Sequence, residues 1–239
     1  MKLRDKIVIG MIFVIGILSN YALAATFTLG AGSGSEFQCT YIDLSNETVN
    51  FGTEVFFMTK SNGGSGVYRG LLFVPGLKDS IYGKTVNSST LSMRAFNWTI
   101  GWADTVYVYG LRRHFSETQA TWDIAVTGTS WGTLGADNTS TDRYSTVYAA
   151  KCVTDTTAGG RLEFNVTTFL QYCDGSDTAN FQGFIIAPAP SQNLYHNLSF
   201  MSDNWTTTAD RPTISVDYGG SSSPSGQGTR RRPHKKAGS

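Results

Sequence analysis

The sequence predicts an all-β protein, a sandwich or barrel of short strands in one domain. Short segments rich in β-branched and aromatic residues recur along the chain, and clusters of Gly, Ser, Asn and Thr separate them. Many short strands at regular spacing are typical of sandwiches and barrels. Only residues 166–172 suggest a helical turn or two. Between the two atypical ends lie about 195 residues, a length that suits one large β domain.

Residues 1–24 have the features of a secretory signal peptide. Three basic residues precede an uncharged apolar run, Ile7 to Leu18, and the small residues of Ala22-Leu23-Ala24 follow it. The run is shorter than the roughly 20 residues of a membrane-spanning helix, so a cleaved leader is favoured over an anchor. We therefore expect a secreted protein, extracellular or at the cell surface, with no membrane span after cleavage near Ala25.

Residues 25–36 contain a short strand candidate, Ala25 to Leu29, and then a linker of Gly and Ser. Two interpretations are open. The strand is either the ordinary first strand of the sandwich or an arm that adds to the sheet edge of a neighbouring subunit. The second interpretation predicts self-association through this strand.

Residues 37–219 contain the strands of the predicted domain. Thr53 to Thr59 and Val67 to Val74 flank a Gly-rich turn and form a predicted hairpin. Further strands are expected at 90–98, 105–111, 161–166, 183–187, 198–202 and 213–218.

The stretch from Thr118 to Ala136 predicts a long ordered loop. It contains three glycines, each of which weakens a helix by about 1 kcal/mol, so that a helix is disfavoured. Trp122 and Trp131 supply large apolar anchors that hold such a loop against the domain. Ordered loops of this length are commonly functional.

Residues 220–239 form a predicted disordered tail, rich in Gly and Ser and ending in a basic cluster. Without this cluster and the leader, acidic residues outnumber basic ones in the folded part. Phosphate contacts need a basic face, so nucleic acid is not expected as a partner of the folded domain.

Six segments carry a family resemblance because they occur in a particular order. They are Thr40-Tyr41-Ile42 with Asn50-Phe51-Gly52, Arg69 to Phe73, Thr118 to Ala136, Leu162 to Leu170, Asn180 with Gly183 to Ile186, and Arg211 to Tyr218. Together they resemble the DNRLRE family of extracellular domains, which is related to a carbohydrate-binding module family. The resemblance covers Gln38 to Tyr218 and implies a jelly-roll-type antiparallel β-sandwich. It departs from the family at Cys39, where an Asp is usual.

The resemblance implies a non-catalytic domain that binds polysaccharide or a cell-surface glycan. Trp98 and Trp102 flank a turn-like segment and offer aromatic faces to sugar rings. Modules of this type are associated with acidic polysaccharides, which favours basic contacts. The basic candidates are Lys60, Arg69, Arg94, Arg112 and Arg113. For Arg69, a structural ion pair explains the residue equally well.

An alternative function is a structural subunit of an extracellular filament, surface layer or matrix, which the N-terminal strand and linker favour. The sequence contains only weak matches to enzyme motifs. Gly128 to Gly132 fits Gly-x-Ser-x-Gly, but the following residues do not form the helix that a nucleophile elbow needs. A glycosidase with two carboxylates from separate strands stays open as a minor alternative. We expect no enzyme and no cofactor apart from a structural calcium ion.

The calcium candidates are Asp137 and Asp142, in a loop rich in oxygen ligands, with a second cluster at Asp174 and Asp177. Calcium takes about six to eight oxygens, and the alternative for such loops is a solvated turn.

Three cysteines are present, and exported domains often form disulfides. Cys152–Cys173 is the favoured pair, while the other pairings and free thiols remain open.

Overall fold

The structure is a computed structural model that describes residues 24–33, 36–60, 66–96, 104–153, 159–173, 181–189 and 198–219. Nearly all of the predicted leader, the basic tail and the candidates Trp98, Trp102, Asp174 and Asp177 lie outside the described residues.

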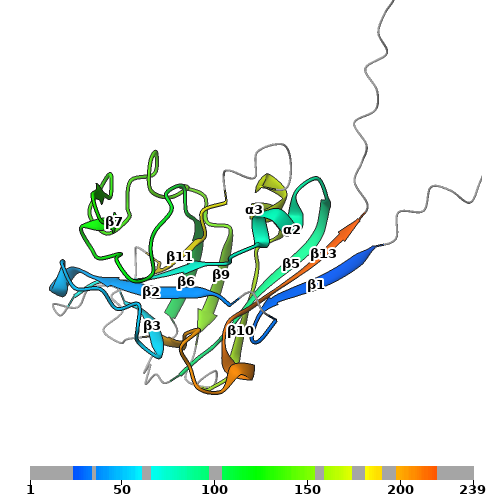
Figure 1. The fold of residues 1–239 in the computed structure, drawn as a ribbon, viewed down its shortest axis with the longest axis horizontal. Coiled ribbons are helices and arrows are strands. Elements are labelled where there is room, and N and C mark those ends of the chain that lie inside the picture. The colour runs from blue at the N-terminus through cyan, green and yellow to red at the C-terminus, as the bar shows by residue number, and fades with distance from the viewer. Residues whose placement is uncertain are drawn as a thin grey trace, which may run out of the picture.

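Two antiparallel sheets form a β-sandwich, which confirms the predicted fold class (Figure 1). The four-stranded sheet has the order β1 (Ala25–Gly30), β13 (Thr213–Gly219), β5 (Thr85–Arg94) and β10 (Arg161–Asn165). The five-stranded sheet has the order β2 (Gln38–Asp43), β4 (Tyr68–Phe73), β11 (Phe184–Pro188), β6 (Asp104–Gly110) and β9 (Ala149–Val153).

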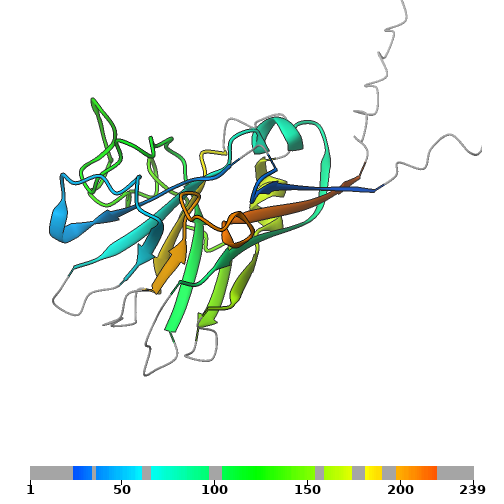
Figure 2. The same ribbon diagram turned by 60° about the horizontal axis from the view of Figure 1, so that its bottom comes forward.

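Smaller elements accompany the two main sheets (Figure 2). They are the pair β3 (Phe56–Thr59) and β12 (Leu198–Met201), the pair β7 (Ile124–Val126) and β8 (Thr129–Ser130), the helices α2 (Leu77–Ile81) and α3 (Thr167–Cys173), and the short 3-10 helices Leu44–Asn46 and Thr208–Asp210. Within the described ranges, no helix has the length and apolar character to cross a membrane.

The main core lies between the two sheets and follows from strand alternation. Leu91 of β5 pairs with Ile214 of β13 and Phe164 of β10, and all three side chains are buried. Opposite them, Cys39, Leu72 and Phe184 form a buried row across β2, β4 and β11. Successive side chains of a strand point to opposite faces of its sheet. The residues directly before and after each of these buried residues therefore point to the outer faces of the sandwich.

A second core lies on the outer face of the five-stranded sheet. Leu71 and Ile185, which pair across β4 and β11, point to this face. Residues 112–148, here termed the cover segment, lie over part of it (the green chain near β7 in Figure 1). Trp122 and Trp131 of this segment are each only 5% exposed, and Trp131 donates its indole N–H to the Thr121 carbonyl at 2.9 Å. The predicted anchoring by tryptophans is confirmed, but the segment is not wholly a loop, because β7 and β8 pair within it.

The predicted hairpin between residues 53–59 and 67–74 is wrong in its main pairing. β3 pairs with β12, whereas β4 pairs with β2 and β11. Among the described residues, one isolated β-bridge joins Lys60, directly after the first segment, to Tyr68, and Phe57 of β3 lies against Gly70 of β4. The Phe57 ring stacks on the Phe200 ring at 5.3 Å, and this contact over a long sequence separation favours β12 as the partner.

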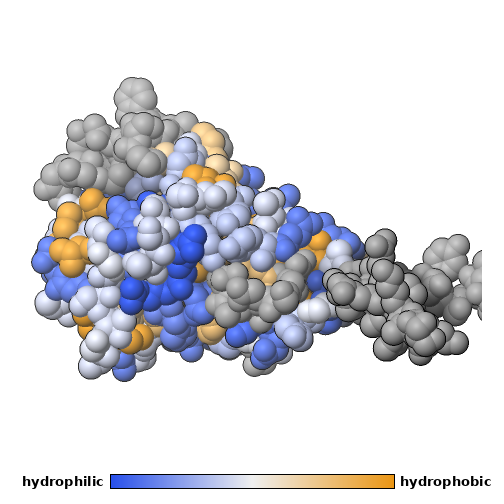
Figure 3. Space-filling view, turned by 90° about the horizontal axis from the view of Figure 1, so that it is seen from above, coloured by the Kyte–Doolittle hydropathy of each residue, from blue (hydrophilic) through white to orange (hydrophobic). Residues whose placement is uncertain are grey.

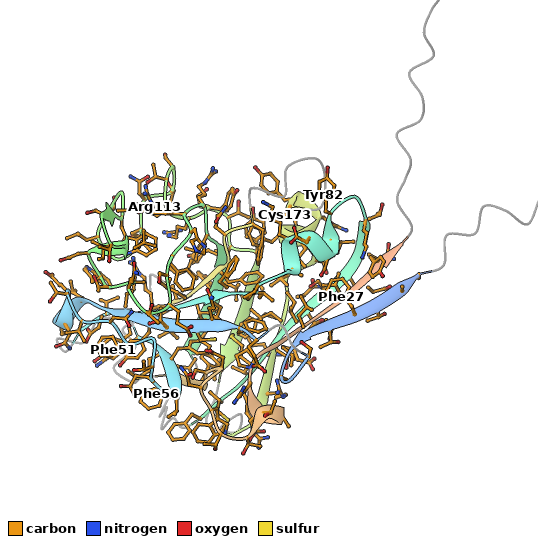
Figure 4. The ribbon with its side chains drawn as sticks, viewed as in Figure 1. Phe27, Phe51, Phe56, Tyr82, Arg113 and Cys173 are labelled. Atoms are coloured by element: carbon orange, nitrogen blue, oxygen red, sulfur yellow. The ribbon has the colours of Figure 1, made fainter. Side chains whose placement is uncertain are left out.

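The Cys152–Cys173 disulfide prediction is also wrong, because Cys39, Cys152 and Cys173 form no disulfide. Cys152 lies on β9 directly before the buried Val153, so alternation turns its side chain outward, and it is exposed. Cys173 is buried at the end of α3 (Figure 4). The two thiols therefore point into different environments.

The exterior is largely polar on the face drawn in Figure 3, where hydrophobic residues occur as scattered spots. The exposed large hydrophobic side chains include Tyr82, Leu134 and Tyr172, which belong to separate segments. The described residues of this face therefore form no broad apolar surface, and hollows that combine polar and apolar groups are the more informative features.

Candidate functional site

A cavity of about 190 Å³ opens on the outer face of the five-stranded sheet, beside the cover segment. Strands β4, β6 and β11 provide its floor, and the cover segment provides one wall. The lining residues are Val67, Arg69, Tyr109, Asp137, Arg143, Ile185, Ala187 and Pro188. Because Leu71 pairs with Ile185, alternation brings Arg69 and Ala187, each two residues away, to the same face.

Three charged side chains meet in the cavity. Asp137 accepts hydrogen bonds from the Arg69 guanidinium at 3.2 Å and from Arg143 at 2.7 and 3.0 Å. Arg69 also donates to the Gly135 carbonyl. The side chains of both arginines are 17% exposed, and that of Asp137 is 39% exposed. Two guanidinium groups and one carboxylate leave an excess positive charge on the cavity wall.

Aromatic rings support both guanidinium groups. Arg143 lies 4.4 Å from the Tyr109 ring centroid, and Arg69 lies 5.2 Å from that of Trp122. Such contacts favour the cation and fix its orientation. Burial lowers the pKa of Arg69, and the neighbouring Asp137 opposes this shift. Burial raises the pKa of Tyr109, so its hydroxyl stays neutral at physiological pH.

This arrangement suits an anionic ligand with an apolar face. Guanidinium groups bind carboxylates through charge-assisted and often paired hydrogen bonds. Ile185, Ala187 and Pro188 supply apolar surface beside the Tyr109 ring. Pockets that combine apolar walls with a few fixed polar groups are typical binding sites for small ligands.

Of the basic residues predicted from the sequence, the structure places only Arg69 in this cavity. Arg112 stacks on the Tyr144 ring at 4.0 Å. Arg113 forms an ion pair with Asp142 at 3.1 Å and, like Arg112, belongs to the cover segment (Figure 4).

The other two basic candidates lie elsewhere. Arg94 is on β5 of the opposite sheet and pairs with Asp210 at 2.6 Å. Lys60 is buried after β3, with its ammonium group 5.5 Å from the Tyr68 ring centroid. The predicted set therefore does not converge on one surface.

The calcium candidates take part in other interactions. Both Asp142 oxygens accept hydrogen bonds, from the backbone N–H groups of Gly132, Thr133 and Asn138 at 2.8 to 3.2 Å and from Arg113. Asp137 pairs with two arginines. In the parts of the chain that the structure describes, no three His, Cys, Asp or Glu side chains come together as a metal ion needs. This geometry does not support calcium at Asp137 and Asp142.

Sequence reasoning missed most of the cavity. Arg143, Tyr109 and the residues of β11 were not among the candidate site residues. The alternation of β6 puts Tyr107 and Tyr109 on one face, which is a usable signal. Their neighbours, however, depend on the order β4-β11-β6 and on the position of the cover segment, which alternation does not give.

A second polar cluster joins the cover segment to β2. The Cys39 backbone N–H lies 2.9 Å from a Glu117 carboxyl oxygen and 3.1 Å from one of Asp203. Burial, and then the charge of Asp203, raises the pKa of Glu117 to about 8. Burial also raises the pKa of Asp203. The two acids are thus close together at a seam of the fold, and neither lines the cavity.

No family model matches this sequence, and no curated protein matches it either. The resemblance to DNRLRE domains therefore stays a prediction, and we infer the function from the residues of the site.

Proposed function

We propose that this protein is a secreted, non-catalytic domain of the DNRLRE type that binds acidic carbohydrate in the cavity of the five-stranded sheet. The observation that carries the proposal is the pair of arginines, Arg69 and Arg143, held over aromatic rings in a hollow with an apolar floor.

The charge balance supports an acidic sugar as the ligand. Asp137 neutralises one of the two guanidinium groups, and a sugar carboxylate would neutralise the other. Guanidinium groups have five N–H donors each, so Arg143 and Arg69 keep donors beyond those that Asp137 and the backbone use. The apolar floor provides contact for the C–H face of a pyranose ring.

The positions of the acidic residues support binding without catalysis. Hydrolysis of a glycosidic bond commonly uses two carboxyl groups on opposite sides of that bond. Among the described residues, Asp137 is the one acid that lines the cavity, and it is engaged by both arginines. The Glu117–Asp203 pair is shared with the Cys39 backbone, outside the cavity.

An array of neutral and uronate-containing oligosaccharides tests the proposal with three proteins: the unaltered chain, Arg143→Gln and Arg94→Gln. We expect the unaltered chain to retain uronate-containing glycans. Arg143→Gln should weaken this binding about tenfold or more, since a hydrogen bond to a charged group contributes roughly 1.5–3 kcal/mol. Arg94→Gln removes an arginine of the opposite sheet and should bind normally.

Circular dichroism and thermal unfolding establish that the variants are folded before the array is read. Equal binding by Arg143→Gln and the unaltered chain would exclude the cavity as the site. Retention of no glycan by the unaltered chain would reject the proposed function.

A further inference from the structure

We propose that β1 exchanges between two copies of this chain, so that β1 of one copy occupies the place beside β13 of another. This inference goes beyond carbohydrate binding and does not rest on it, because β1 belongs to the four-stranded sheet and the cavity to the five-stranded sheet.

The first observation is how β1 is attached. It is the edge strand of its sheet, and β13 is its one strand neighbour among the described residues. Their antiparallel ladder runs from Ala25 opposite Tyr218 to Gly30 opposite Thr213. In Figures 1 and 2, β1 and β13 project together from the body of the domain. The strand can therefore leave without disturbing the order of the other strands.

The second observation is what β1 covers. Leu29 and Phe27 pack against the main core, and the Phe27 ring lies 5.7 Å from that of Tyr218. Without β1, the backbone groups of β13 would be exposed along an edge, next to the buried Ile214 and Val216. An open edge beside a core recruits another strand. The β1 of a second copy fits it, because it repeats the register and side chains already seen within one chain.

The third observation is the turn after β1. Gly30, Ala31 and Gly32 follow one another with φ of 87°, 46° and 85°. Glycine adopts this left-handed conformation readily, whereas alanine is strained in it. Ser33 donates its backbone N–H to the Gly30 carbonyl at 3.1 Å and closes the turn.

The closed turn is therefore strained at Ala31, and an extended connection releases that strain. The contacts of β1 with β13 are the same in both forms. Exchange thus costs few contacts and relieves the backbone strain at Ala31 in the hinge after β1. Proteins swap elements between copies under such conditions. The product is a closed dimer when two copies exchange reciprocally, or an open chain of subunits when exchange runs head to tail.

A disulfide trap distinguishes the two forms of the β1 ladder. Thr28 of β1 and Ser215 of β13 are direct partners, with hydroxyl oxygens 2.9 Å apart. Thr28→Cys with Ser215→Cys, in a Cys152→Ser background that removes the exposed native thiol, should form a disulfide in either form. The disulfide lies within one chain when β1 is closed and joins two chains when β1 is exchanged.

The matched control uses the next strand of the same sheet. Thr90 of β5 is the other direct partner of Ser215. Thr90→Cys with Ser215→Cys in the same background places a disulfide between β5 and β13, which belong to the same chain in both forms. This variant should therefore migrate as a monomer after denaturation. Remaining thiols are blocked, and the chains are then separated under denaturing, non-reducing conditions.

We expect the Thr28/Ser215 trap to give covalent dimers or longer species whose fraction rises with protein concentration. Multi-angle light scattering of the full chain without engineered cysteines should show the same assemblies. Ala31→Gly should lower the exchanged fraction about fivefold per hinge, as expected for relief of left-handed alanine strain in the closed form.

Two results would overturn the proposal that β1 exchanges between copies. One is a Thr28/Ser215 trap that migrates as a monomer at every concentration. The other is a full chain that scatters as a monomer throughout and does not respond to Ala31→Gly. Glycan binding is read separately, so loss of the carbohydrate proposal would leave these outcomes unaffected.

Discussion

The outer face of the five-stranded sheet has two halves that differ in how their polar groups are satisfied. Under the cover segment, Trp122 and Trp131 exclude water, and the charge of Asp142 is matched by backbone donors and Arg113. In the adjacent half, Arg69, Arg143 and Asp137 share contacts but leave a hollow. A fully satisfied polar group stabilises the fold, whereas a partly satisfied one in a cavity is available to a ligand.

A substitution under the cover segment should reduce the stability of the protein most. Trp122→Ala removes a ring that is 5% exposed and that packs directly against Gly135, so it should lower the free energy of unfolding by about 3–5 kcal/mol. Urea denaturation measures the change. Leu134→Ala, at a side chain 52% exposed in the same segment, should change it little. A loss below about 1 kcal/mol for Trp122→Ala would mean that the cover is not anchored there.

The next effect concerns Asp142. Asp142→Ala leaves three backbone N–H groups and Arg113 without their acceptor and should cost about 3 kcal/mol, measured by urea denaturation. Asp79→Asn, on the exposed side of α2, is the control. Stability equal to that of the unaltered chain would contradict the role of Asp142 in closing the segment.

The role of Asp142 also predicts how the stability of the protein depends on pH. Burial raises the pKa of Asp142, but its hydrogen bonds outweigh burial and lower it overall. A lowered pKa in the folded state means that its contribution is present above the pKa of the unfolded chain and is lost as pH falls through the folded value. The unaltered chain should therefore lose stability in acid more steeply than Asp142→Ala.

The Glu117–Asp203 pair should show the opposite pH dependence and a smaller effect. The pKa of Glu117 is raised to about 8, mainly by burial, so the folded state holds a proton that the unfolded chain releases at lower pH. Its stabilising contribution is present in acid and is lost as pH rises toward that value. Glu117→Gln should keep the neutral form and stabilise the protein above pH 8 by roughly 1 kcal/mol, since partial exposure weakens the effect.

Thermal unfolding at several pH values between acid and pH 9 measures this contribution. An identical pH profile for Glu117→Gln and the unaltered chain would show that the pKa of Glu117 is the same in the folded and unfolded states, and would contradict the raised pKa. Glu163→Gln, at an exposed residue of β10, is the matched control and should not alter the profile.

A similarly small effect on stability is expected in the open half. Arg143→Gln removes one of the two partners of Asp137, while Arg69 still pairs with that carboxylate. The carboxylate is 39% exposed, so the unfolding free energy should fall by only about 1 kcal/mol. A much larger loss, measured by urea denaturation, would show that Arg143 is a structural residue and would remove the contrast between the two halves.

Strand alternation and turn residues were sufficient to predict much of the sandwich. β6, β10, β11, β12 and β13 lie close to the segments expected from the sequence, and the segment anchored by tryptophans is present. Pairing was harder to predict. The partner of β3 depends on the contact between Phe57 and Phe200, which are far apart in sequence.

The candidate site was only partly predictable for the same reason. Arg69 was among the candidates because of its residue type and its place in the resemblance. Arg143 and Tyr109 join it only through the strand order and the fold of the cover segment. The sequence marked Asp137 and Asp142 as similar acids, but their surroundings, two guanidinium groups for one and backbone donors for the other, give them different roles.

The most direct test of the account is calorimetric titration of the full chain with an oligosaccharide of glucuronic acid and with the same oligosaccharide after its carboxyl groups are reduced. The cavity model predicts binding of the acidic form, at least about tenfold weaker binding of the reduced form, and a similar loss for the acidic form with Arg143→Gln but not with Arg94→Gln. Equal affinity for the two oligosaccharides, or no heat of binding from either, would contradict it.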